Sequence, residues 1–115
     1  MELKKLYLTV DLVGYWHNSF DNNYLFTTAE NLVQPESPDY DTAEAFAFIV
    51  LDENLNITNE AIAVSFKQDG DNVILGYRMH RFTVLSANRF AVVFSNGFAT
   101  YKFQRPANHI LYKGV

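Results

Sequence analysis

Cysteine is absent from this chain of 115 residues, and proline and glycine are scarce, with three and five copies. Without cysteine, the chain can form neither a disulfide scaffold nor a thiolate metal site. No apolar run is long enough to span a bilayer, so a membrane is not an expected partner. Apolar residues nevertheless make up 49% of the chain, which excludes intrinsic disorder. The length fits a single domain with one core, which we expect to cover residues 1–115.

Acidic residues are absent after Asp71, although the whole chain has a net charge of −4. Residues 1–71 hold thirteen acids against three lysines, a net charge of −10, and residues 72–115 hold six Lys and Arg, a net charge of +6. This separation indicates either acidic and basic strands that neutralise each other across a sheet, or a cationic surface for an anionic ligand. Nucleic acid is not an expected partner, because the total charge is acidic and no basic–aromatic motif is present.

The N-terminus mimics a signal peptide for a few residues only. Asp11 cuts the apolar run short, and no small-residue cleavage site follows. We therefore expect a cytoplasmic protein, unless a leader has been removed.

Aromatic residues are abundant, with ten Phe, seven Tyr and one Trp, and they favour pleated, half-buried strands. From Leu6 to Trp16 apolar and polar positions alternate, which predicts a strand with one buried face. Further strands are predicted at residues 24–27, 43–51, 61–67, 73–80, 82–85, 89–95, 98–105 and 110–112. Segment 43–51 also fits a capped helix, but the turn-like residues 52–56 after it favour a strand in a hairpin.

Turn signals separate these strands. Residues 68–72 predict a hairpin turn, and Asn96-Gly97 fits a two-residue turn. Thr27 to Glu30 has capping-box spacing, which predicts one short helix over residues 29–33 that stops before Pro35. The sequence therefore predicts an all-β fold, most simply an antiparallel barrel of about eight strands with at most one short helix.

Two motifs near the ends of the chain carry a resemblance to a known family. The Gly14-x-Trp16 motif resembles the first-strand signature of lipocalin-like (calycin) barrels, and Tyr101-x-Phe103-x-Arg105 is similar to the last strand of small bacterial lipocalin-like domains. The resemblance implies that Trp16 plugs the closed end of the barrel and that Arg105 covers its indole face, with Lys102 as the substitute. A guanidinium over an indole gains a cation–π contact of about 0.5–2 kcal/mol.

The resemblance also implies a small-molecule site at the barrel mouth. Such barrels commonly grip an anionic head group with an inward arginine, and Arg78 takes this role if Ile74 and Gly76 face inward. An inward cation is costly unless a carboxylate pairs with it. If Val73 and Leu75 face the core instead, Arg78 is an exposed side chain.

Other side chains that could line this site are tyrosines and one histidine. Hydroxyl groups would come from Tyr77, Tyr101 and Tyr112, although large core aromatics are the alternative for each. His17 follows the plug strand directly and is expected at a barrel end. The chain is shorter than secreted lipocalins, so side chains alone can fill a barrel of this size.

A second resemblance concerns the loop at residues 95–100. It is similar in position to the glycine-containing loop of staphostatins, small bacterial inhibitors of papain-like proteases that also carry a Gly-x-Trp element. The resemblance implies a loop presented to a protease cleft, and an ordinary Asn-Gly hairpin is the alternative.

No catalytic or metal signature is present in the sequence. His17, His80 and His109 lack metal-ligand spacing. No serine lies in a Gly-x-Ser-x-Gly elbow, and there is no thiol nucleophile. We therefore expect neither an enzyme nor a cofactor. The prediction is non-catalytic binding of a small, partly apolar or anionic ligand in the barrel mouth, and the alternative is a protein-interaction module, such as a cysteine-protease inhibitor or an oligomerising subunit.

Overall fold

All the described elements of the protein are β-strands. The computed structural model describes residues 12–28, 32–33 and 43–106. The strands are β1 (Gly14–Asn18), β2 (Asn23–Thr27), β3 (Leu32–Val33), β4 (Ala43–Leu51), β5 (Ile57–Asp69), β6 (Asn72–Tyr77), β7 (His80–Ala87), β8 (Ala91–Ser95) and β9 (Thr100–Gln104). Within these ranges, no helix has the length and apolar character needed to cross a membrane.

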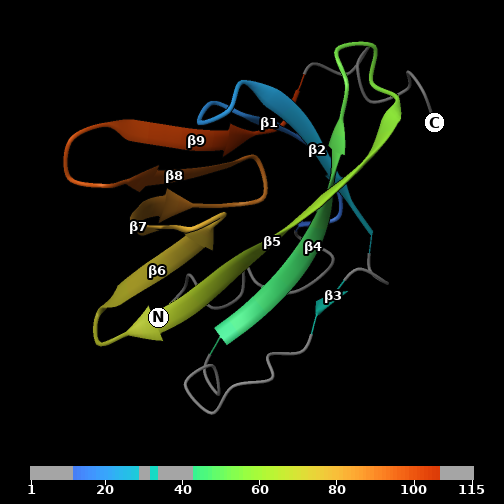
Figure 1. The fold of residues 1–115 in the computed structure, drawn as a ribbon. Helices are drawn as coiled ribbons and strands as arrows, with labels where there is room; N and C mark the ends of the chain where they lie inside the picture. The colour runs from blue at the N-terminus through green and yellow to red at the C-terminus, as the bar shows by residue number, and fades with distance from the viewer. Residues whose placement is uncertain (1–11, 29–31, 34–42, 107–115) are drawn as a thin grey trace.

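The strands form one antiparallel sheet that closes into a barrel (Figure 1). Neighbours follow the order β2-β1-β9-β8-β7-β6-β5-β4, and a pairing between β2 and β4 joins the two ends. The closed barrel has eight strands. The short β3 is not one of them and pairs with the first half of β4, at Ala45 and Phe46. The predicted antiparallel barrel of about eight strands is confirmed, and segment 43–51 is a strand.

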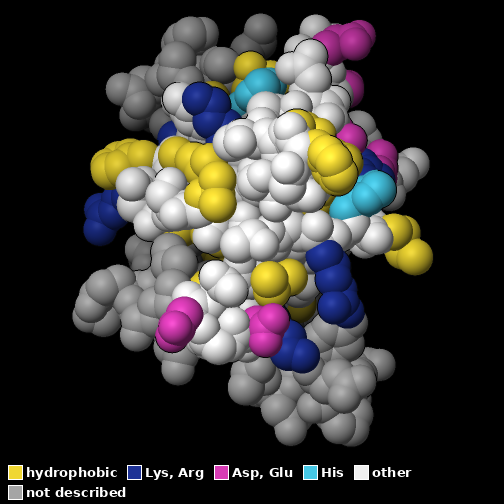
Figure 2. Space-filling model, turned by 90° about the vertical axis from the view of Figure 1, so that its left-hand side faces the viewer, with side chains coloured by type: hydrophobic (Ala, Val, Ile, Leu, Met, Phe, Trp, Pro, Cys, Tyr) yellow, Lys and Arg dark blue, Asp and Glu magenta, His cyan; other side chains and the backbone are white. Residues whose placement is uncertain are grey.

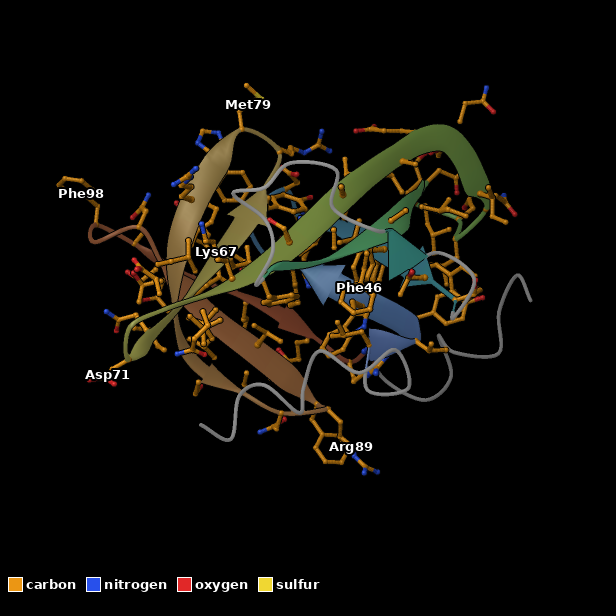
Figure 3. The ribbon with its side chains drawn as sticks, turned by 90° about the horizontal axis from the view of Figure 1, so that it is seen from below. Phe46, Lys67, Asp71, Met79, Arg89 and Phe98 are labelled. Atoms are coloured by element: carbon orange, nitrogen blue, oxygen red, sulfur yellow. The ribbon has the colours of Figure 1, made fainter. Side chains whose placement is uncertain are left out.

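The core lies inside the barrel and follows the alternation along each strand. In β6, Val73, Leu75 and Tyr77 are fully buried, whereas the residues between them are partly exposed. Phe46 of β4 likewise lies inside the barrel (Figure 3). Each large side chain buried in this way contributes roughly 1.5–3 kcal/mol, so the aromatic strand faces are the main source of stability.

The N-terminal strand and the short helix were placed wrongly by the sequence patterns. Strand β1 begins at Gly14, and Leu12 and Val13 lie outside it, while residues 6–11 fall outside the described ranges. The φ of Gly14 is +111°, a backbone conformation that turns the chain out of an extended strand. Leu32 and Val33 form β3 rather than the end of a helix, because the edge of β4 offers them backbone hydrogen-bond partners. Residues 29–31 lie outside the described ranges.

Two hairpins also differ from expectation. Tyr77 pairs with His80, so Arg78 and Met79 form a two-residue turn and His80 belongs to β7. Ser95 pairs with Thr100, which makes residues 96–99 a four-residue loop rather than a two-residue Asn-Gly turn. The predicted strand at 110–112 lies outside the described residues.

Candidate functional site

The two ends of the barrel differ in chemistry. The plug end holds the start of β1, the end of β9, and the turns at 70–71 and 88–90. The mouth end holds the turns at 19–22, 78–79 and 96–99. The alternation of antiparallel strands fixes this division, since successive hairpin turns fall on opposite ends.

At the plug end, Trp16 is buried inside the barrel and is covered by Arg105. The indole is 1% exposed, and its Nε1 donates a hydrogen bond to the Leu12 carbonyl at 2.9 Å. The guanidinium carbon of Arg105 lies 3.9 Å from the centre of the Trp16 ring. The structure thus brings together the two residues that the family resemblance paired. Lys102 does not take this place, because it is exposed between the inward-facing Tyr101 and Phe103.

Backbone contacts hold the Arg105 guanidinium in position. Its Nη1 donates to the carbonyls of Val13 at 2.9 Å and Tyr15 at 3.2 Å, and its Nε donates to the Arg89 carbonyl at 2.9 Å. A Cβ added to Gly14 would stand 3.0 Å from Nη1. Glycine at this position therefore serves two needs, the positive φ and the close approach of the guanidinium. At the plug end, the donors of Arg105 are therefore used in contacts within the chain. The candidate functional site is the mouth end.

At the mouth end, the Phe20 ring covers a cluster of aromatic side chains. Its centre lies 4.9 Å from that of Tyr101, 5.4 Å from Phe82 and His80, and 5.7 Å from Tyr77. Most of these contacts are edge-to-face, the arrangement that aromatic pairs favour. The mouth therefore has an apolar, aromatic side.

A polar network lies directly beside this cluster. The buried Tyr77 hydroxyl accepts a hydrogen bond from Asn18 Nδ2 at 2.6 Å and donates one to Asp21 Oδ2 at 2.7 Å. The same Asp21 oxygen accepts from Arg78 Nε at 2.8 Å, and Arg78 Nη2 meets Glu60 at 2.7 Å. Two donors of different kinds thus converge on one carboxylate oxygen at the barrel mouth.

Arg78 adopts an unusual backbone conformation for its side chain. Its φ is +58°, and it is the first residue of a two-residue hairpin turn, where glycine is the usual choice. A non-glycine residue in this region costs about 1–2 kcal/mol. In this turn the Arg78 guanidinium forms ion pairs with Asp21 and Glu60, which offset part of the backbone strain.

The pKa values of the network follow from these contacts. Burial, and then the adjacent Asp21 carboxylate, raises the pKa of Tyr77 well above its usual range. The hydrogen bonds that Arg78 donates to Asp21 and Glu60 raise its pKa further above its usual value. At neutral pH the Tyr77 phenol is therefore neutral and Arg78 is charged, with Asp21 and Glu60 as its ion-pair partners.

The predicted ligand-contacting residues are only partly brought together. Arg78 lies over the Tyr77 ring, and Tyr101 is connected to Tyr77 through the Phe20 ring, but Arg78 is not an inward cation, since its side chain is 34% exposed. Val73 and Leu75 face the core, which is the alternative in which Arg78 is exposed. His17 lies on the outer face of β1 between the inward Trp16 and Asn18, with its ring 4.9 Å from that of Tyr24. Tyr112 lies outside the described residues.

Four residues of the mouth were missed from the sequence. Asn18, Phe20 and Asp21 lie between two predicted strands, and Glu60 lies in the first part of β5, before the segment predicted as a strand. Glu60 is recognisable only by its contact with Arg78 in the folded chain. The charge separation along the chain is the one signal that pointed to such pairs, since acids of the first part meet a base of the second.

The barrel interior is filled by side chains. Its largest inward-facing members are each less than 2% exposed: Trp16, Tyr77, Phe46, Phe48, Phe66 and Phe94. A side chain that borders a water-sized cavity has accessible surface inside that cavity. These side chains have almost none, so they border no such cavity. The described interior therefore leaves no room for a ligand beside these side chains.

Exposed apolar side chains mark a second feature of the mouth end. Phe98 is 97% and Met79 is 95% exposed, and both point away from the barrel at hairpin tips (Figure 3). The loop that carries Phe98 is fixed by its own hydrogen bonds, in which Asn96 Oδ1 accepts from the backbone N–H groups of Phe98 and Ala99, and Ser95 Oγ accepts from Gly97. On the face seen in Figure 2, hydrophobic side chains form several separate groups among charged ones, not one continuous patch.

Comparisons with known proteins add no assignment. No protein-family model, curated protein or solved structure matches the chain. Among the described residues, no group of three or more His, Asp or Glu side chains is placed to hold a metal ion.

Proposed function

We propose that this protein is a non-catalytic binding protein for a small, partly apolar ligand with an anionic group, which it holds at the barrel mouth. The observation that carries the proposal is the convergence of Arg78 Nε and the Tyr77 hydroxyl on one carboxylate oxygen. A guanidinium and a phenol at this spacing supply charge-assisted donors for a carboxylate-like group. The rings of Phe20, Phe82 and Tyr101 stand beside them and supply apolar surface.

The backbone of Arg78 supports this role. A strained residue persists where its side chain is needed, and an unstrained glycine in this turn would have no guanidinium. In the described part of the barrel the interior offers no competing site, since the inward side chains pack against one another.

A titration of ¹⁵N-labelled protein with small carboxylates tests the proposal. Hexanoate and 3-phenylpropionate are compared with the matching alcohols, and amide shifts are followed at the mouth and at the plug end. We expect saturable shifts around residues 77–82 for the acids and none for the alcohols. Native mass spectrometry of freshly purified protein and displacement of a fluorescent fatty acid provide independent readings.

A variant pair connects binding to the guanidinium. Arg78→Gly removes the charge and fits the positive φ, so it leaves the turn unstrained. Loss of a charge-assisted hydrogen bond weakens binding by about tenfold or more. Arg81→Gln is the matched control, because Arg81 is exposed on the adjacent strand and faces outward opposite Gly76. Equal affinities of the two variants for the acids would refute the proposal.

A second candidate function is a protein-interaction module, such as an inhibitor of cysteine proteases. The observation that favours it is the rigid loop of residues 95–100, which presents Phe98 almost fully exposed. Preorganised aromatic side chains are frequent anchors of protein interfaces. Inhibition assays with papain-like proteases test this function: Phe98→Ala should abolish inhibition, and Phe90→Ala, at the plug end, should retain it.

A further inference from the structure

The turn between β1 and β2 supplies an aromatic ring and a carboxylate from adjacent residues. The Phe20 ring packs on the aromatic cluster, with its centre 4.9 Å from that of Tyr101 and 5.4 Å from that of Phe82. The next residue, Asp21, places one carboxylate oxygen 2.7 Å from the Tyr77 hydroxyl and 2.8 Å from Arg78 Nε. One dipeptide therefore satisfies both the apolar and the cationic side of the proposed site.

The ends of this turn are held by hydrogen bonds to neighbouring strands, and its centre is held by the contacts of the Phe20 and Asp21 side chains. Ser19 is tied to β9 on both sides, since its N–H donates to the Lys102 carbonyl and its Oγ accepts from the Lys102 N–H. Asn23 pairs with Asn18 as the first residue of β2. Between them, the Asp21–Arg78 pair is partly solvent-exposed, with side-chain exposures of 27% and 34%. An ion pair exposed to this degree stabilises weakly, and a ligand carboxylate can replace Asp21 as the acceptor of the hydrogen bonds from both Arg78 and Tyr77.

We infer that Phe20 and Asp21 occupy the ligand's place, and that the ligand is a small carboxylic acid with an aromatic or similarly flat apolar body. This inference rests on the proposed function and specifies the ligand class. A flat carboxylate reproduces what Asp21 offers to Arg78 and Tyr77, and an aromatic body reproduces the edge-to-face contacts of Phe20. The ligand displaces the turn, and the turn lowers the apparent affinity by the fraction of time it fills the site.

The test is to remove the internal occupant and measure affinity for defined acids. Phe20→Ala, Asp21→Asn and the double variant are titrated with 3-phenylpropionate, hexanoate and 3-phenylpropan-1-ol by NMR and calorimetry. The matched controls are Phe90→Ala and Asp71→Asn, which make the same changes in turns at the plug end. Circular dichroism and Trp16 fluorescence establish that each variant is folded. Glu60→Gln breaks the other ion pair of Arg78 and leaves Asp21 in place.

The expected result is a gain in affinity for 3-phenylpropionate of about tenfold in each single variant and more in the double variant. The gain should be smaller for hexanoate, for the alcohol and in Glu60→Gln, and absent in the two controls. If the wild-type protein binds acids through Arg78 but the variants bind no tighter, the inference is overturned and the proposed function stands. If no folded variant binds any acid, the proposed function itself is refuted. Equal gains for acid and alcohol would overturn the carboxylate assignment.

Discussion

Replacing Gly14 by alanine should destabilise the protein for two separable reasons. The first is backbone strain, because φ is +111° and a side chain in this region costs about 1–3 kcal/mol. The second is crowding, because the new Cβ would stand 3.0 Å from Arg105 Nη1 and press on the guanidinium over Trp16. Gly97 separates the two effects: its φ is +92°, but an added Cβ meets nothing within 4 Å. Gly97→Ala therefore measures strain alone.

The magnitude of the second effect follows from what Arg105 contributes. Its cation–π contact with Trp16 accounts for about 1 kcal/mol. Its part-buried hydrogen bonds to the Val13 and Tyr15 carbonyls add about 1 kcal/mol each after allowance for solvent. Arg105→Met, which keeps the apolar stem, should therefore cost about 3 kcal/mol, a large share of a typical 5–15 kcal/mol of stability.

The assay is urea unfolding followed by the fluorescence of the single tryptophan, Trp16. In a double-mutant cycle, Gly14→Ala should cost about 0.5–1.5 kcal/mol less when Arg105 is already methionine, because the crowded neighbour is gone. The strain part should remain and match the cost of Gly97→Ala. If Gly14→Ala costs no more than Gly97→Ala even when Arg105 is present, the close approach of Arg105 does not require glycine and the reasoning is wrong.

Further predictions concern the mouth. Arg78→Gly should be about 1 kcal/mol more stable than Arg78→Ala in urea unfolding, because both lose the ion pairs but only glycine relieves the positive φ. Tyr77→Phe should cost about 1–3 kcal/mol, since Asn18 and Asp21 lose a buried partner. Burial and then Asp21 raise the pKa of Tyr77, so the folded protein keeps a proton that the unfolded chain releases. Its stability should therefore fall as the pH rises above about 10, and less so in Tyr77→Phe. Phe98→Ala should change stability by less than about 0.5 kcal/mol, because its side chain touches little of the fold.

Short-range sequence patterns predict much of the architecture. Alternation predicts a strand at 73–77, the turn-like residues 52–56 favour a strand over a helix at 43–51, and local turn chemistry at residues 68–72 predicts the hairpin between β5 and β6. The pairing of Trp16 with Arg105 followed from a resemblance between short motifs, and the structure places the two side chains in contact. The family itself stays a prediction.

Turn lengths and strand limits were less accessible, because backbone angles decide them. Arg78 ends β6 because its φ is +58°, and the neighbouring residues in the sequence do not predict this backbone angle. The four-residue loop at 96–99 depends on the pairing of Ser95 with Thr100, and hydrogen bonds accepted by the Asn96 and Ser95 side chains stabilise the loop. One residue of difference in register reverses which side chains face the core.

The sequence by itself determined the class of fold, because alternation and turn residues act within a few positions of each other. Only the tertiary structure decided that β2 pairs with β4 and closes the barrel, and that Asp21 meets Tyr77 and Arg78. The contacts of Asp21 join residues more than fifty positions apart, and they exist because barrel closure and strand register bring the turn after β1 next to the end of β6. Local sequence preferences do not predict contacts between residues so far apart in the chain, so the residues of the mouth could be identified only from the folded structure.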